Sequence, residues 1–366
     1  MYVIRILINQ PLRLILTLLG IALCIILIMF ILGIYNGVAE GSVEYIKKTK
    51  ADLWVLQANS TNMIRGTSLL SAVYNDVIKT NTMIKSATPV LLLMTNVKVH
   101  NQSATVLLTG YVPGSEGGPP RIVEGRGVQK NYEIVIDKSF AAKHKIRVNN
   151  IIIIKEDTLD IVGISSGTNA FVTQYAFVTL KYEQSIIELP GLASLFIINA
   201  KHKNDISSIR KYIEAKLPGR FSIYTHEVFL KNNIAEMEAG ILPLFFAIAT
   251  IGGVVLAIIL SLILSVNILE RRKDFAIMKI LGSPNIYLYS LIIFLALILS
   301  LISEVIGVVL YFPLAKLIEK VSPEVTTVIN FEHIFYITLA VCVISIFSAL
   351  MSCKRIKSIY PLEVFA

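Results

Sequence analysis

A single carboxylate, Glu304, stands inside the long apolar stretch from Ile286 to Leu310. An ionisable side chain in such a segment is costly unless it faces protein or water, so a functional role is the first hypothesis for it. Two simpler explanations stay equally open. Glu304 can make a helix-packing hydrogen bond, or its side chain can reach the polar interface, because it lies toward the end of the segment, where the cost of a charge is smaller.

The motifs that mark common enzyme sites are absent from the sequence. There is no G-x-x-x-x-G-K-[ST] phosphate-binding motif, so the chain cannot bind ATP in that way. H-E-x-x-H, paired-cysteine and G-x-S-x-G motifs are also missing, and the five histidines are scattered. Cys24, Cys342 and Cys353 lie in or at the end of apolar segments, which is typical of small packing residues. We therefore expect a non-catalytic chain without a metal or cofactor, so that any ATP driving it is hydrolysed by a separate protein.

The composition is that of a membrane protein. Of the 366 residues, 55% are hydrophobic and only 16% are charged, whereas a soluble domain of this size would expose far more charge. The formal net charge is +9, but many Lys and Arg residues flank apolar segments, where they act as topology signals. No dense basic run carries interleaved aromatics, so the expected partner is the lipid bilayer and not nucleic acid.

Four apolar segments are long enough to cross a bilayer, since about 20 helical residues span its core. The sequence predicts membrane spans at 14–36, 241–269, 286–312 and 333–353. Before and after the spans we expect an amphipathic N-terminal helix at 1–13 and a tail at 354–366. Between the spans we expect a large domain at 37–240, a loop with a short helix at 270–285 and a short outer loop at 313–332.

The distribution of positive charge predicts the orientation of these spans. The short outer loop carries Lys316 and Lys320 together with three glutamates. The opposite side receives a much larger basic set: Arg5, Arg13, Arg271, Arg272, Lys273, Lys279, Lys354, Arg355 and Lys357. We therefore expect a multi-pass protein of the cytoplasmic (inner) cell membrane, with both termini and the 270–285 loop in the cytoplasm and the large domain outside.

The large domain is expected to be α+β. Short apolar or alternating runs predict strands, and residues 150–165 predict a hairpin with a polar tip at Glu156 and Asp157. The predicted strands are 51–57, 104–110, 133–137 and 194–200, and the predicted helices are 69–79, 138–144 and 205–217. From about Thr225 the chain is again helical in pattern, and we expect this helix to continue into the second span. The fold class is thus an α-helical integral membrane protein with four transmembrane helices and a large α+β extracytoplasmic domain between helices 1 and 2.

The run E-R-R-K-D-F-A-I-M-K-I-L-G-S-P at 270–284 resembles the signature of FtsX-like, MacB-type ABC transporter permeases. The end of the chain, Lys354-Arg355 through Pro361-Leu362-Glu363, is similar to the basic stop and Pro-x-Glu tail of that family. One span, a large outer domain and three further spans match its order along the whole chain. Within the domain, A-D-L-W-V at 51–55 and residues 133–164 look like the branch of DevC-type and haem-exporting permeases. The third span departs from the family, because Glu304 stands where a small residue is expected.

The resemblance implies a transmembrane permease subunit that couples ATP hydrolysis to efflux. A separate ABC ATPase would bind ATP and Mg²⁺, and two copies of each chain would form a 2+2 complex around a homodimer. The cargo would be an amphipathic molecule (lipid, lipopeptide, macrolide-like drug or haem), moved by mechanotransmission. A periplasmic adaptor protein is a further partner that the resemblance implies.

The 270–285 loop fits a coupling helix physically. Ile277, Ile280 and Leu281 can form one apolar face for a groove on the ATPase. The basic side chains can face lipid headgroups or acidic residues of the partner. The predicted coupling set is Glu270, Arg271, Arg272, Ile277, Lys279, Ile280, Leu281 and Gly282. The competing explanation is an ordinary basic loop between helices, which the positive-inside rule alone would produce.

A second group of residues is a candidate for contact with cargo. Met29 lies in the first span, and Glu236, Met237 and Glu238 precede the second. A thioether and a carboxylate at a dimer seam could ligate haem iron or contact an amphipathic molecule, as the resemblance to haem exporters implies. Lipid-facing methionine and headgroup-level carboxylates are the simpler explanation. Glu304 completes this predicted substrate-binding set.

Two other functions use the same topology. An FtsX-like regulator would use the motion to switch an extracellular hydrolase and would transport nothing. A membrane-anchored receptor or scaffold would have no ATPase, so that changing Ile277 or Leu281 would affect only local stability.

Overall fold

The computed structural model describes residues 11–63, 68–100, 102–170 and 173–357. The helix predicted at 1–13 lies outside this part up to residue 10, and the predicted tail lies outside it from residue 358. The chain divides into two compact units. We call the first the membrane unit (residues up to 36, 243–320 and from 327 on) and the second the large domain (residues 37–242 and 321–326).

Among the described residues, four helices are long and apolar enough to cross a membrane, as the sequence predicts. They are α2 (Pro11–Lys48), α7 (His226–Glu270), α9 (Asn285–Val321) and α10 (Phe331–Lys357), and the short α8 (Arg272–Ile280) lies between α7 and α9 in sequence. The prediction that one helix begins near Thr225 and continues into the second span is confirmed, because α7 begins at His226.

The predicted loop at 313–332 is largely helical, which corrects the sequence-based boundary. Helix α9 passes through Pro313 and ends at Val321, so that only residues 322–330 connect it to α10. Proline removes one helical hydrogen bond. The eight residues that follow it, L-A-K-L-I-E-K-V, are mostly strong helix formers, and the helix therefore resumes. We call residues 322–330 the α9–α10 connector.

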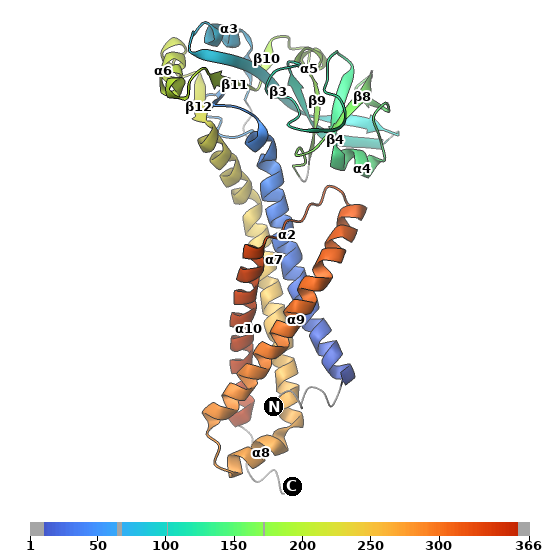
Figure 1. Ribbon diagram of the computed structural model, residues 1–366, viewed down its shortest axis with the longest axis vertical. Coiled ribbons are helices and arrows are strands. Elements are labelled where there is room, and N and C mark those ends of the chain that lie inside the picture. Colours follow the sequence, from blue (N-terminus) through green and yellow to red (C-terminus); the bar gives the residue numbers. More distant parts are fainter. Residues whose placement is uncertain (1–10, 64–67, 101, 171–172, 358–366) are drawn as a thin grey trace. The chain divides into compact units, whose positions relative to one another are not determined.

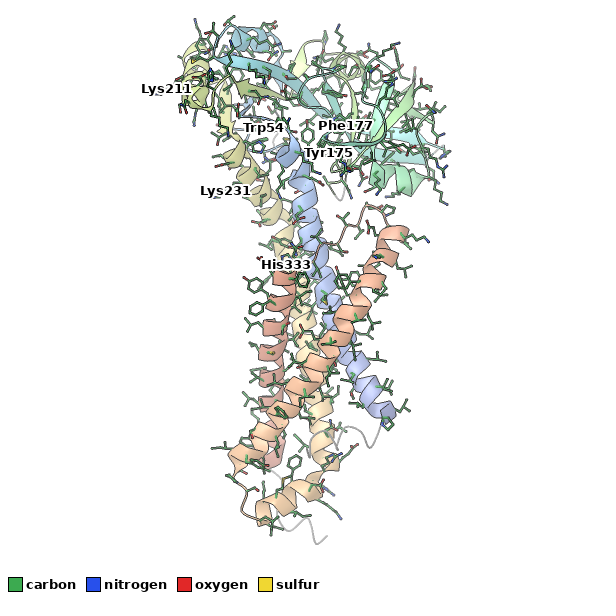
Figure 2. All side chains as sticks on the ribbon, viewed as in Figure 1. Trp54, Tyr175, Phe177, Lys211, Lys231 and His333 are labelled. Carbon is green, nitrogen blue, oxygen red and sulfur yellow. The ribbon has the colours of Figure 1, made fainter. Side chains whose placement is uncertain are left out.

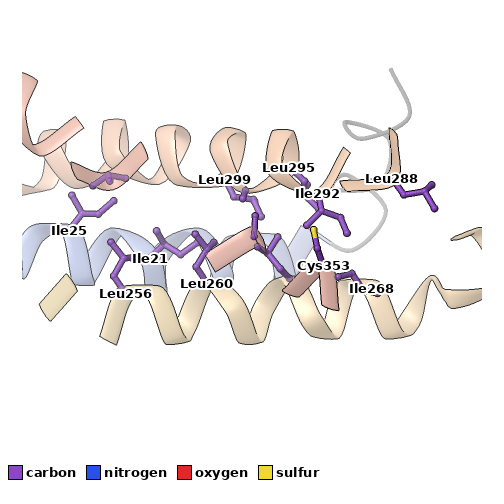
Figure 3. Close-up of a cluster of buried hydrophobic side chains, with 14 of the residues drawn as sticks. Ile21, Ile25, Leu256, Leu260, Ile268, Leu288, Ile292, Leu295, Leu299 and Cys353 are labelled. Carbon is purple, nitrogen blue, oxygen red and sulfur yellow. The ribbon is translucent and has the colours of Figure 1, made fainter. Parts of the chain in front are cut away.

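Apolar side chains from all four long helices form the core of the membrane unit. Figure 3 shows Ile21 and Ile25 of α2, Leu256 of α7, Leu299 of α9 and Cys353 of α10 within one buried cluster. Small polar residues tighten the seam between α7 and α10. The Ser348 hydroxyl donates to the Ala257 carbonyl over 2.8 Å, and the Ser352 hydroxyl donates to the Ser261 carbonyl over 3.0 Å.

The large domain is built on one mixed sheet of ten described strands. Its order is β12 (Phe221–Thr225), β1 (Leu53–Gln57), β11 (Leu195–Ala200), β3 (Ile84–Val99), β4 (Gln102–Tyr111), β9 (Gln174–Thr179), β6 (Glu133–Asp137), β8 (Asp157–Ser165) and β5 (Ile122–Gly125). The tenth strand, β7 (Ile151–Ile154), pairs with β3 and β8. The pairs β4–β9 and β6–β8 are parallel, and the other pairs in the sheet are antiparallel. A small second sheet joins β2 (Leu70–Ser71) and β10 (Leu192–Ala193).

Helices cover the two ends of this sheet, as Figure 1 shows. At the β12 end, Ile78 of α3 (Val73–Lys79) and Ile209 and Ile213 of α6 (Ile206–Lys216) share a core with β1 and β11. A single 3-10 turn, η1 (Lys203–Asp205), precedes α6. At the β8 end, Phe140 of α4 (Lys138–His144) and Tyr182 of α5 (Leu180–Ile186) pack on the other half of β3 and on β4.

A third core within the large domain holds the ends of two long helices. Tyr45 of α2 stacks on Tyr175 with ring centroids 5.0 Å apart, and Phe229 of α7 stacks on Trp54 at 4.8 Å. All four side chains are almost completely buried, and Figure 2 labels Trp54 and Tyr175 in the interior of the domain. The last turns of α2 and the first turns of α7 are therefore part of the domain core.

One carboxyl group, Glu183 of α5, is completely buried in the large domain. It lies against Gly110 of β4, where an added Cβ would come within 2.3 Å of Glu183 Oε2. Among the described residues no cation pairs with it. Burial raises the pKa of the Glu183 carboxyl well above its usual range, and a backbone hydrogen bond at Gly110 only partly opposes this.

This burial predicts a pH dependence of stability. Between the ordinary glutamate pKa and the raised pKa of Glu183, the folded chain holds a proton that the unfolded chain releases, so stability falls as the pH rises. We expect Glu183→Gln to raise the Tm of the detergent-solubilised chain by a few degrees at about pH 8 and to change it little at about pH 4.5. Glu156→Gln, at an exposed position, is the control and should shift neither value. Equal shifts of the Glu183→Gln variant at both pH values would contradict this account.

Candidate functional site

Helix α8 ends in a motif that requires a glycine. Gly282 has φ +84°, a left-handed conformation that L side chains rarely adopt. Its N–H donates to the Lys279 carbonyl over 3.0 Å, and the next N–H, that of Ser283, donates to the Met278 carbonyl over 3.0 Å. This pair of hydrogen bonds is a Schellman motif. The Leu-Gly-Ser part of the sequence signature is therefore a helix stop that fixes Leu281 at the end of α8.

The two faces of α8 differ sharply in exposure. Phe275 and Ala276 are 9% and 0% exposed and belong to the apolar cluster of the membrane unit. Ile277, Ile280 and Leu281 are 44%, 51% and 79% exposed. At about 100° per residue, these three side chains lie on the side of the helix opposite Phe275. We call Ile277, Ile280 and Leu281 the α8 apolar face.

Sequence reasoning identified the α8 apolar face but missed its anchors. The signal for one of them was present, because Phe275 is the large apolar residue opposite Ile277, Ile280 and Leu281 on the helical wheel, whereas Ala276 lies between the two sides. A short helix that is apolar on two sides must bury one of them, and α8 buries the side that carries Phe275. The other side remains uncovered in a single copy of the chain.

The charged residues of the predicted coupling set surround α8. Arg271 caps its N-terminus and lies 4.0 Å from Asp274 in an ion pair. Arg272 is exposed and Lys279 is half-buried, and Glu270 is the last residue of α7. A partner that docks here would meet an apolar face bordered by mainly positive charge.

The α9–α10 connector is held firmly on both sides. In the large domain, Lys143 of α4 forms an ion pair with Glu324 over 2.8 Å, and the Asn169 amide donates to the Glu324 carbonyl over 3.0 Å. In the membrane unit, the Val328 N–H donates to the Gly33 carbonyl of α2 over 2.9 Å. Partial burial works to raise the pKa of Glu324, but the hydrogen bond and charge of Lys143, a backbone hydrogen bond and the charge of His144 together outweigh it, and the pKa is lowered.

Glycines on one side of α2 let the backbone of other segments approach closely. They recur every fourth residue, at Gly33, Gly37 and Gly41. A Cβ at Gly37 would lie 2.0 Å from the Thr326 carbonyl oxygen, and one at Gly41 would lie 2.5 Å from the Asn169 carbonyl oxygen. The sequence analysis overlooked this spacing, although small residues at such intervals are typical of tight helix contacts in membrane proteins.

Glu304 lies inside the membrane unit and does not face lipid. It is 5% exposed, and the Thr338 hydroxyl of α10 lies 2.5 Å from its Oε1. Ser300 and Ser303, which precede Glu304 on the same helix, are also fully buried. This geometry is that of the helix-packing hydrogen bond, one of the explanations left open by the sequence, and it links α9 to α10.

The packing role predicts a graded response to substitution. Glu304→Gln keeps an oxygen for the Thr338 hydroxyl, and we expect its Tm in detergent to match that of the wild type within about 1 °C. Thr338→Val removes the hydrogen bond and should destabilise the chain by roughly 0.6 kcal/mol or more, the average for such bonds between membrane helices. A loss of cargo-stimulated ATP hydrolysis in Glu304→Gln at unchanged Tm would contradict a purely structural role.

The other predicted substrate-binding residues are divided between the two units. Met29 is fully buried in the core of the membrane unit. Met237 is 8% exposed in the large domain, where the Ser42 hydroxyl lies 2.7 Å from its sulfur. Glu236 and Glu238, its neighbours on α7, are half-buried. Their contact with a substrate stays a prediction. Among the described residues, no three His, Cys, Asp or Glu side chains gather where they could hold a metal ion.

Comparison with known proteins places the chain in a class. Residues 14–216 match the family described as MacB-like periplasmic core domain, and residues 245–361 match that described as FtsX-like permease C-terminal. An uncharacterised ABC transporter permease of Mycobacterium tuberculosis is 20% identical over 360 residues, covering 96% of this chain and 95% of that protein. A Staphylococcus haemolyticus protein, provisionally named hemin transport system permease HrtB, is 21% identical over 340 residues, covering 92% and 91%. The crystallised periplasmic region of MacB from Actinobacillus actinomycetemcomitans has a TM-score of 0.42 and 14% identity, covering 51% of this chain and 94% of that one.

Four apolar helices in the described part of the chain, with a large α+β domain between the first and second, and the two family matches define a multi-pass membrane permease of the ABC transporter class. More particularly, the chain belongs to the MacB/FtsX-type permease family. Permeases of this class are generally non-catalytic membrane subunits, and membership implies partnership with an ABC ATPase subunit.

Proposed function

We propose that two copies of this chain and two copies of a separate ABC ATPase form an exporter that moves an amphipathic molecule out of the membrane or away from its outer side. The observation that carries the proposal is α8, which anchors itself through Phe275 and Ala276 while its apolar face remains exposed. Helix-in-groove docking uses such a face. ATP and Mg²⁺ would be bound by the ATPase, and the proposed role of this chain is to transmit motion.

The proposed orientation has α8 in the cytoplasm and the large domain outside. Support comes from the basic residues around α8, since positive charge concentrates on cytoplasmic loops. Arg272 and Lys273 are exposed there. This arrangement would bring an ATPase to α8 and keep the large domain on the side to which cargo is released.

The proposed route of motion runs along continuous helices. Helix α7 has 45 residues, about 68 Å of helix, and extends from the core of the large domain to the residue before Arg271. Its first turns are held by stacking of Phe229 on Trp54. The α9–α10 connector supplies a second link, because Glu324 is bound to Lys143 of α4. A push on α8 would thus reach the large domain through two separate connections.

The cargo class is proposed from the relatives. The hemin transport permease of Staphylococcus haemolyticus makes haem one candidate, beside a lipid, a lipopeptide or a macrolide-like compound. Met29, Glu236, Met237 and Glu238 are the proposed contacts, and the predicted fifth contact, Glu304, is instead assigned to helix packing. Because Met29 is fully buried, it would reach cargo only when α2 moves relative to its neighbours. An adaptor protein on the outer side is a further proposed partner.

Cargo-stimulated ATP hydrolysis in lipid nanodiscs tests this proposal. The chain would be co-expressed and purified with a candidate ABC ATPase and assayed with each cargo class, haem included. We expect one class to raise turnover several-fold and Met29→Leu to reduce that response, whereas Met94→Leu, at an exposed site of the large domain, should not. A stable complex that no cargo stimulates would instead favour an FtsX-like regulator of an extracellular hydrolase. Failure to bind any ATPase would favour a receptor or scaffold.

A further inference from the structure

A cavity of about 650 Å³ opens on the large domain beside α4. Its apolar lining comes from Val123 of β5, Ala141 of α4, Ile146 after α4 and Ile164 of β8. Val123 is 46% exposed, whereas the other three side chains are 3–6% exposed and belong to the domain core. The volume lies within the range of about 300–1,000 Å³ that is usual for small-molecule sites.

Positive charge dominates the rim of this cavity. Lys138, Lys145 and Arg147 line it with one carboxylate, that of Glu124. All three cations are exposed, and no ion pair involves them in the part of the chain that the structure describes. The nearest carboxylate in sequence, Asp137, is buried and is occupied by the Ser139 N–H and the Thr168 hydroxyl. The rim therefore carries a net positive charge, with three cations against the one carboxylate of Glu124.

The stability of α4 accounts for Lys145 but not for Lys138. Cations at the C-terminal end of α4 would complement the helix dipole, but Lys138 is its first residue, where a cation is unfavourable. Lys145 has φ +55° because it ends α4: its N–H donates to the Ala142 carbonyl, and the next N–H, that of Ile146, donates to the Ala141 carbonyl over 3.0 Å. This backbone places the Lys145 side chain among the residues that line the cavity.

We propose that this cavity binds an anionic amphiphile, whose alkyl chain contacts the exposed Val123 and Ala142 and whose phosphate or carboxylate head lies among Lys138, Lys145 and Arg147. The apolar lining provides the hydrophobic contribution, and the head forms charge-assisted hydrogen bonds with the cations. A bilayer lipid headgroup and a free single-chain amphiphile share this chemistry. The site is a property of the large domain and does not depend on transport or on an ATPase.

Photolabelling with an octyl phosphate that carries a diazirine near the end of its chain tests this site directly. The full-length chain would be held in nanodiscs of neutral phosphatidylcholine, irradiated, digested and mapped by mass spectrometry. We expect labelled peptides around Val123 and Ala142, and we expect unlabelled octyl phosphate to compete. Nanodiscs with added anionic lipid distinguish a bilayer lipid from a free amphiphile as the ligand. If the site binds lipid headgroups, the anionic lipid would compete and reduce labelling. If the site binds only free amphiphiles, labelling would not change.

Charge variants make the test specific. The pair Lys138→Glu and Arg147→Glu should reduce labelling at this cavity roughly tenfold. The neutral pair Lys138→Met and Arg147→Met keeps the alkyl stems and should reduce labelling less than the charge-reversed pair does. It also provides the test if the charge-reversed pair fails to fold. Lys211→Glu with Lys216→Glu makes the same charge change on exposed positions of α6 and should have no effect. Equal competition by octanol, equal competition by inorganic phosphate, or labelling that ignores both pairs would overturn the proposal.

Discussion

Leu281→Asp is expected to separate the permease from its ATPase. Leu281 is 79% exposed at the end of α8, so an aspartate there leaves the fold of this chain unchanged and acts on the partner alone. A leucine that fills a pocket at the centre of a small interface contributes about 2–4 kcal/mol, and a buried carboxylate adds a desolvation cost. We expect affinity for the ATPase to fall at least about 100-fold, measured by co-purification and by titration in nanodiscs.

The matched control for this variant is Leu189→Asp. Leu189 lies in the large domain, away from α8, and is 54% exposed, so this variant introduces the same aspartate at a site that no ATPase is expected to contact. Its complex with the ATPase should stay intact. Phe275→Ala provides a further comparison, because it removes the anchor of α8 and should weaken both the thermal stability of the chain and the binding of the ATPase. Undiminished binding by Leu281→Asp would show that α8 is an ordinary basic loop.

Gly37→Ala is expected to destabilise the chain more than the same substitution at any other glycine of α2. The new Cβ would lie 2.0 Å from the Thr326 carbonyl oxygen, and a backbone atom cannot rotate away as a side chain can. The connector would have to shift and strain the ion pair of Glu324 with Lys143. Overpacking of this kind costs roughly 1–3 kcal/mol, which should lower the Tm by about 5 °C.

At Gly20, also on α2, the same substitution should leave the Tm unchanged or raise it. Gly20 has nothing within 4 Å of an added Cβ, and alanine is the better helix former by about 1 kcal/mol. Thermal unfolding of the two variants in detergent therefore makes a matched pair, with Gly20→Ala neutral or stabilised and Gly37→Ala destabilised. Similar Tm values for the two would show that the connector does not lie against Gly37 in solution.

Local patterns were enough to predict much of the fold. Residues 133–137 are a short apolar run after a turn, and they form β6. The helix predicted at 138–144 has the bounds of α4. The hairpin predicted at 150–165 forms β7 and β8. Six of the described strands were not predicted, and for β3 and β9 the reason is identifiable. Strand β3 contains Pro89, which normally argues against a strand, and β9 is buried at all six positions, so that it lacks the alternation of a half-buried strand.

The candidate site was predictable only where it is local in sequence. The apolar face of α8 follows from helical spacing within nine residues, because a helical wheel needs no knowledge of the tertiary fold. The contact of Lys143 with Glu324 joins residues 181 positions apart, and that of Gly37 with Thr326 joins segments from opposite ends of the chain. Such pairings depend on how the helices associate. The structure thus adds the anchors, the connector and the burial of Met29 and Glu304, which no local pattern contains.

Photo-crosslinking from α8 is the measurement that tests the central claim most directly. A benzoyl-phenylalanine would replace Leu281 in one sample and Phe275 in another, and each would be irradiated in nanodiscs with the candidate ATPase present. We predict a crosslinked product with the mass of one permease plus one ATPase from position 281, and only crosslinks within the chain or to lipid from position 275. No ATPase adduct from position 281, in a sample that still hydrolyses ATP, would contradict the assignment of α8 as the docking surface.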